Sequence, residues 1–114
     1  MTLKELRKIV VDFRDARDWR QFHTPKDLVI SMMVEVGEVA DHFKWKNDEE
    51  LESYLKSHKA EIADELADVL HNLVLTADEL DIDLEKAFKK KICETEEKYP
   101  VEKARGNNKK YNKL

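Results

Sequence analysis

The stretch "MVEVGEVADHFKW", residues 33–45, combines apolar residues at helical spacing with two carboxylates one turn apart, Glu35 and Glu38. It extends an apolar face that begins further upstream, so we predict a helix over about residues 25–43. That face carries Leu28, Met32, Val36, Val39 and Phe43. The two glutamates lie at its edge. Gly37, between them, costs roughly 1 kcal/mol relative to alanine, but its bare backbone permits the close approach of another helix or of a ligand.

Three further helices are predicted outside this stretch. The first covers about residues 2–17, with Thr2 and Glu5 as a capping box. After a polar bridge, in which Asn47 or Asp48 caps a short helix through Leu55, the third covers about 59–80 and the fourth about 84–98, where Tyr99-Pro100 ends it. These lengths predict an all-α four-helix bundle in one domain, residues 1–114, with a basic tail at about 101–114.

Composition excludes several classes of protein. The 114 residues include only two glycines and two prolines, and this scarcity of turn residues argues against a many-stranded β fold. The single Cys93 excludes an internal disulfide and a cysteine-based metal site. A net charge of −4 gives no reason to expect nucleic-acid binding. No apolar run reaches the roughly 20 residues of a membrane span, and the N-terminus resembles no targeting peptide, so we expect a cytoplasmic protein.

Acidic side chains follow one flank of the third helix as well. Glu61, Glu65, Asp68 and Asn72 form a polar stripe beside its apolar face. If the second and third helices pack by their apolar faces, the two acidic flanks converge, and desolvated carboxylates repel unless something compensates. With no histidine or cysteine in the set, Mg²⁺ or Mn²⁺ fits better than Zn²⁺. Spacing alone leaves a solvated or salt-bridged surface as an alternative.

The joint pattern of these motifs resembles a known family. "VEVGE" followed by "ELAD" resembles the ExxE…ExxD signature of the MazG-like nucleotide pyrophosphohydrolases, an all-α superfamily. The flanking segments are similar to its dCTP-pyrophosphatase-like branch, in the same order over nearly the whole chain. They are "ARDWRQFHTPKDLVISMMVEVGEVADHFKWK", "EIADELADVL", "KYP" and "ARGNNKKY".

The resemblance implies an enzyme that hydrolyses nucleoside triphosphates between the α- and β-phosphates, with Mg²⁺ required and Mn²⁺ as a substitute. It implies a house-cleaning role on non-standard or surplus deoxynucleotides such as dCTP-like substrates. The implied metal ligands are Glu35, Glu38, Glu65 and Asp68, of which Glu38 and Glu65 are the candidates for activating water. The family also implies a homodimer, or a homotetramer built as a dimer of dimers, with the site completed across subunits.

The resemblance further implies base-binding and phosphate-binding residues. The base would meet Trp19, His23, Trp45 and Asn72; some relatives specific for dCTP carry tyrosine where this chain has Asn72. The triphosphate would meet Lys91, Arg105, Lys110 and Tyr111. Composition alone leaves an ordinary alternative in each case: aromatic caps on a small core, and a solvated basic tail.

Two competing hypotheses stay open from the residues alone. One is a non-catalytic helical module that binds a nucleotide or a protein, although such a binder has no need of four mutually repelling acids. The other is a di-iron site, prompted by His42 and His71 near the acids. That site needs paired Glu-x-x-His motifs on two helices, and this chain has none.

Overall fold

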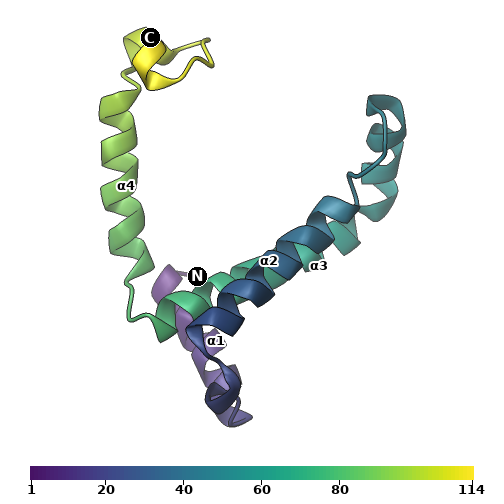
Figure 1. Cartoon of the computed structure of the whole chain (residues 1–114), viewed down its shortest axis with the longest axis vertical. Coiled ribbons are helices and arrows are strands. Elements are labelled where there is room, and N and C mark those ends of the chain that lie inside the picture. Colours follow the sequence, from purple (N-terminus) through teal and green to yellow (C-terminus); the bar gives the residue numbers. More distant parts are fainter. The chain divides into compact units, whose positions relative to one another are not determined.

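The structure, a computed structural model that describes residues 1–114, consists of helices joined by loops, without strands (Figure 1), which confirms the all-α prediction. The chain divides into two compact units, Met1–Ile82 and Asp83–Leu114. No helix combines the length and the apolar character that a membrane crossing requires. The helices are α1 (Leu3–Ala16), α2 (Pro25–Asp41), α3 (Asp48–Glu79), α4 (Leu84–Lys98) and α5 (Val101–Ala104), with 3-10 turns η1 (Arg20–Phe22) and η2 (Tyr111–Lys113).

Capping side chains set the starts of the helices where the sequence predicts them. Thr2 and Glu5 form the complete capping box of α1. The Thr24 hydroxyl accepts from the Asp27 backbone N–H, with Pro25 in the first turn of α2. Asn47, rather than Asp48, caps α3 by accepting from the backbone N–H of Glu50. Local side-chain chemistry therefore specifies these three helix starts.

The prediction of two separate helices between residues 47 and 80 is wrong. α3 runs without interruption from Asp48 to Glu79 and is 32 residues long. The segment "SHKA", which we interpreted as part of a polar bridge, contains neither proline nor glycine, so nothing in it breaks a helix. The Ser57 hydroxyl also bonds back to the carbonyl of Tyr54 within the same helix.

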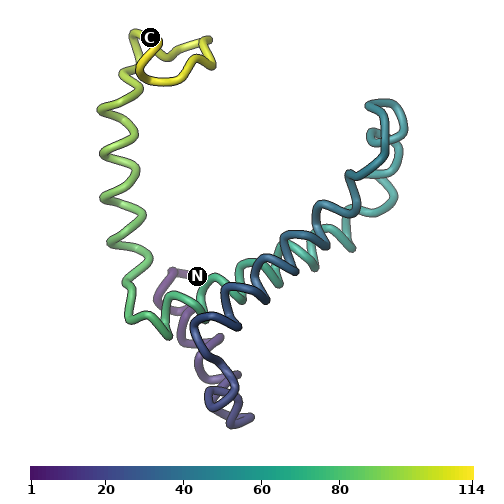
Figure 2. The backbone as a smooth tube through the Cα atoms, viewed as in Figure 1, coloured from purple at the N-terminus to yellow at the C-terminus, as the bar shows by residue number.

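In the first unit, α2 and α3 lie side by side in antiparallel orientation, and α1 packs against α3 (Figures 1 and 2). The buried apolar core is small: Val10, Leu28, Val74, Leu75 and Ala77. Much of the predicted apolar face remains exposed, including Val36 at 50% and Leu66 at 53%. A single chain therefore covers only part of the apolar surface of the α2–α3 pair.

A buried ion pair fastens α1 to the end of α3. Arg14 is only 2% exposed, and its Nη1 lies 2.8 Å from Asp78 Oδ2. Arg7 donates from Nε to the other oxygen of Asp78 at 3.0 Å, and Asp15 accepts from Arg14 Nε at 2.9 Å. Burial acts to raise the pKa of Asp78, but the hydrogen bonds from the two arginines outweigh it and lower that pKa.

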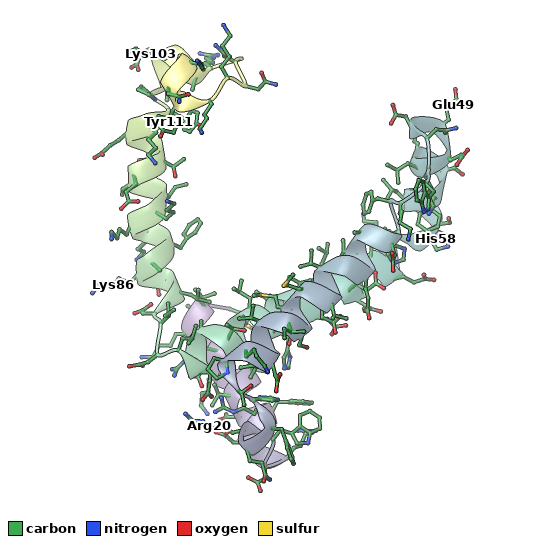
Figure 3. All side chains as sticks on the ribbon, in the orientation of Figure 1. Arg20, Glu49, His58, Lys86, Lys103 and Tyr111 are labelled. Atoms are coloured by element: carbon green, nitrogen blue, oxygen red, sulfur yellow. The ribbon has the colours of Figure 1, made fainter.

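In the second unit, the tail folds back on the end of α4. The Tyr111 backbone N–H donates to the Tyr99 hydroxyl at 3.2 Å. Their rings meet edge to face with centroids 6.2 Å apart. Figure 3 shows Tyr111 beside the last turn of α4. The basic tail, which has no helical periodicity, is therefore ordered by contacts with Tyr99.

Asp78→Asn is expected to lower the free energy of unfolding by about 3 kcal/mol, because it leaves the buried Arg14 guanidinium without its main counter-charge. Chemical denaturation followed by circular dichroism measures this. The matched control is Asp12→Asn, which breaks an exposed pair with Lys8 and should leave the free energy of unfolding almost unchanged. Equal effects of the two substitutions would contradict the role of the Arg14–Asp78 pair.

The same pair should make the folded state sensitive to acid. The pKa of Asp78 is lower in the folded chain than in the unfolded one, so its contribution is complete above about pH 4 and is lost as the pH falls toward the folded pKa. Wild-type stability should therefore fall more steeply below about pH 4 than that of Asp78→Asn. Parallel stability–pH curves for the two proteins would contradict this linkage.

Candidate functional site

The packing of α2 along α3 brings the four predicted acids within electrostatic reach of one another. Glu35 lies on α2, half-buried, and burial is the main reason why its pKa is raised. The neighbouring carboxylate of Glu38 raises that pKa further, as do Asp68 and Glu65 on α3. The packing of α2 along α3 therefore places Glu35 close enough to Glu65 and Asp68 for their charges to act on it.

The residues of this acidic cluster (Glu35, Glu38, Glu65 and Asp68) fit a hard divalent cation by their chemistry. Glu35 Oε2 and Glu65 Oε2 are both buried and make no hydrogen bond of good geometry. A buried carboxylate oxygen without a partner, such as Glu35 Oε2, is the kind of ligand that Mg²⁺ takes. In this conformation, no three acid, histidine or cysteine side chains lie close enough together to coordinate one ion.

A histidine beside the cluster was not predicted from the sequence. His42 Nε2 is in contact with Glu65 Oε2, although the ring N–H is not well aligned with that oxygen. The sequence indicates His42 only as a candidate iron ligand, because it lies near Glu38 in the chain. Its contact with α3 is long-range, so no periodicity in the sequence signals it. The ion contact of the cluster is this one, with a histidine.

Two of the predicted base-binding residues lie near the start of α2, beside α1. The ring of Trp19 meets that of Phe13 edge to face at 5.8 Å, and Phe13 meets His71 at the same distance. His23 is half-buried with an unpaired Nδ1, and burial followed by the charge of Arg14 lowers its pKa, which favours a neutral ring. Phe13 and His71 were not predicted to belong to this aromatic group, because they lie on different helices.

Arg17 covers the same aromatic group, with its guanidinium carbon 3.6 Å from the centre of the Phe13 ring. This contact was missed as well, although the spacing of four residues between Phe13 and Arg17 on one helix face could have indicated it.

Trp45 lies at the opposite end of α2 from Trp19. α2 has 17 residues and therefore spans roughly 25 Å. In Figure 3, Arg20 and Glu49 are labelled at opposite ends of the α2–α3 pair. Trp45 is 89% exposed and has a positive φ of 65°, which is unusual for a residue other than glycine. Within one chain, a single base cannot contact both Trp19 and Trp45.

Asn72 makes a hydrogen bond within its own helix, and Gly37 has open space beside it. The Asn72 amide donates to the Asp68 carbonyl of its own helix at 3.0 Å. This bond uses one of its two N–H donors and leaves the amide oxygen free. A Cβ on Gly37 would have no atom within 4 Å, so no helix of this chain packs tightly there. Of the two interpretations of Gly37, close packing within the chain is wrong.

The predicted phosphate-binding residues all lie in the second unit. Around the Tyr111 ring lie Lys98, with Nζ 4.9 Å from the ring centre, and Lys110 at 5.9 Å. Arg105 ends the short α5 just before Gly106, whose φ of 70° turns the chain. Lys91 lies earlier on α4 and forms an ion pair with Glu94 at 3.8 Å. The structure therefore groups Lys110 with Tyr111, while Lys91 has an acidic partner of its own.

Comparisons with known proteins agree with this architecture. The MazG-like family model matches residues 30–114. The chain is 37% identical to the dCTP pyrophosphatase 1 of Rattus norvegicus and 36% identical to that of Homo sapiens, over 99% of this chain and 68% of each relative. The crystal structure of a pyrophosphatase from Archaeoglobus fulgidus superimposes with a TM-score of 0.78 at 38% identity, covering 86% of this chain and 92% of that one. This chain belongs to the MazG-like family.

Proposed function

We propose that this nucleotide pyrophosphohydrolase converts deoxynucleoside triphosphates to monophosphates and pyrophosphate, with Mg²⁺ held by the acidic cluster. The observation that carries the proposal is the buried Glu35 Oε2, which has no hydrogen bond and lies within electrostatic reach of Glu38, Asp68 and Glu65. The similarity to dCTP pyrophosphatase 1 supports a deoxynucleotide substrate of the dCTP type. We propose that residues 1–114 act as one catalytic domain in the cytoplasm, clearing surplus or non-standard deoxynucleotides.

The acidic cluster is suited to holding the ion and orienting the water. Mg²⁺ bound there would neutralise charge on the triphosphate oxygens as the α–β anhydride bond breaks. Glu35 and Asp68 supply ligand oxygens from facing helices. Glu38 and Glu65, which we assign as ligands too, are the two candidates for orienting the attacking water, and one of them would accept its proton. No lysine or arginine forms an ion pair with these four acids, and His42 contacts one oxygen of Glu65 only.

We propose that the aromatic group near the start of α2 receives the base. Trp19 is 44% exposed and offers a face for stacking. The unpaired Nδ1 of His23 and the free amide oxygen of Asn72 can hydrogen-bond to a polar edge of the base. Arg105, Lys110 and Tyr111, joined by Lys91, supply positive charge and hydrogen bonds for the phosphates.

We propose that the active form is a homo-oligomer, either a homodimer or a homotetramer built from dimers. On α2 the large apolar side chains Ile30, Met33, Val34 and Val36 are each at least half exposed. A second copy would cover this surface and could bring a Trp45 toward the Trp19 end of its neighbour. That arrangement would explain how residues from both ends of α2 serve one base.

The direct test is incubation of the protein with Mg²⁺ and a panel of standard and modified deoxynucleoside triphosphates. We expect monophosphate and pyrophosphate in equal amounts, because hydrolysis occurs at the α–β bond. Separation of the products by ion-exchange chromatography identifies the bond that breaks. Release of orthophosphate with a diphosphate would contradict this bond assignment, and binding without any product would support a non-catalytic nucleotide-binding module instead.

Glu38→Gln is expected to lower kcat by at least about 100-fold, since it removes a cluster charge and a proton acceptor without changing side-chain size. Steady-state release of pyrophosphate measures the effect. The matched control is Glu61→Gln, an exposed acid on the same flank of α3 that we do not assign to the cluster. Equal loss of activity in both variants, or full activity in Glu38→Gln, would contradict the assignment.

Glu35→Gln should stabilise the metal-free protein at neutral pH. Because the folded pKa of Glu35 is raised, its ionised form opposes folding, and that penalty grows as the pH rises through the shifted pKa. The variant should also lose most of the stabilisation that Mg²⁺ gives the wild type, about 2.7 kcal/mol when free Mg²⁺ is 100 times its dissociation constant. Thermal unfolding with EDTA and with Mg²⁺ measures both effects; an unchanged response to Mg²⁺ would reject Glu35 as a ligand.

A further inference from the structure

One histidine bridges the acidic cluster to a tyrosine that no proposed role involves. His42 follows the last residue of α2 and is only 8% exposed. Its Nδ1 lies 2.6 Å from the Tyr54 hydroxyl, and its Nε2 is in contact with Glu65 Oε2. Both ring nitrogens of a buried imidazole are therefore engaged, one by a phenol and the other by a cluster carboxylate.

The tyrosine in this bridge is itself held in place. His58, one turn further along α3, stacks on the Tyr54 ring with centroids 3.8 Å apart and an angle of 8° between the planes. The Nζ of Lys46 lies 4.2 Å from the centre of the same ring. His58 also bonds through Nδ1 to the Tyr54 carbonyl at 3.0 Å. The phenol thus has little freedom to move away from His42.

The chemistry of the three groups favours one direction of hydrogen bonding. An ionised carboxylate only accepts, so the imidazole must present its N–H to Glu65 from Nε2. In the neutral tautomer with that proton, Nδ1 is an acceptor, and the Tyr54 hydroxyl is the donor that it requires. In that tautomer Tyr54 donates to Nδ1, and the proton of Nε2 lies on the side of the ring that contacts Glu65 Oε2.

We propose that His42 is a positioning residue for Glu65. By occupying Oε2 it fixes the rotation of the carboxylate and leaves Oε1 for a divalent cation. This inference rests on the metal site of the proposed function. Outer-sphere partners of metal-binding side chains typically contribute 10–100-fold to metal affinity. Through its contact with Glu65, His42 would be such a partner.

Two substitutions distinguish the role of the ring nitrogen Nε2 from that of Nδ1. In His42→Gln the amide nitrogen takes the place of Nε2 and keeps a donor toward Glu65. In His42→Asn the amide takes the place of Nδ1 and keeps a partner for Tyr54 only. Both variants are polar, and both lose the ring, so any general effect of removing the imidazole is shared by the pair.

The readout is Mn²⁺ affinity without nucleotide, measured on the full chain from the electron paramagnetic resonance signal of free Mn²⁺. We expect His42→Asn to weaken binding by about 10–100-fold and His42→Gln to stay within about threefold of the wild type. A loss below about tenfold in His42→Asn, or a loss in His42→Gln as large as in His42→Asn, would overturn the proposal. Circular dichroism and thermal unfolding in EDTA verify that both variants fold.

Glu65→Gln separates a failure of this inference from a failure of the proposed metal site. If the wild type binds Mn²⁺ and Glu65→Gln does not, the site holds, and the two His42 variants decide the inference. If the wild type binds no Mn²⁺, the metal site and the positioning role of His42 are rejected together. If both His42 variants lose thermal stability but bind Mn²⁺ as the wild type does, His42 is a structural residue and the proposal is wrong.

Discussion

Mutual repulsion between carboxylates on facing helices is the constraint on which the proposed chemistry depends. Two like charges about 4 Å apart at an effective dielectric constant of 20 repel by about 4 kcal/mol. α2 and α3 nevertheless place Glu35 near Glu38, Asp68 and Glu65, and its pKa is raised, first by burial and then by these carboxylates. Apolar packing between the helices resists this repulsion, and the Arg14–Asp78 pair anchors one end of α3 against α1. A divalent cation would turn the same repulsion into attraction.

A single chain leaves this arrangement incomplete. The buried core of the first unit is small, while apolar side chains along α2 face outward. Trp45 is almost fully exposed on a backbone with positive φ. A non-glycine residue in that conformation costs on the order of 1 kcal/mol or more unless its surroundings compensate. An oligomer explains these features together, because the neighbour would cover the apolar face and give Trp45 a ligand or a partner to contact.

The sequence predicts well those features that depend on local chemistry. Thr2, Thr24 and Tyr99-Pro100 mark helix ends because capping and proline effects act within a few residues. Glu35 faces the acidic flank of α3, which follows from helical periodicity once the two helices pack. The split of α3 was wrong because a polar surface segment was interpreted as a break. His42 with Tyr54 and Phe13 with His71 could not be predicted, since each pair joins different helices.

The most direct measurement is anomalous diffraction from a crystal of the protein grown or soaked in Mn²⁺. The account predicts a manganese peak between α2 and α3, within coordination distance of carboxylate oxygens from Glu35, Glu38, Glu65 and Asp68. Crystals in which these four side chains bind no manganese, or in which the ion binds elsewhere, would contradict it.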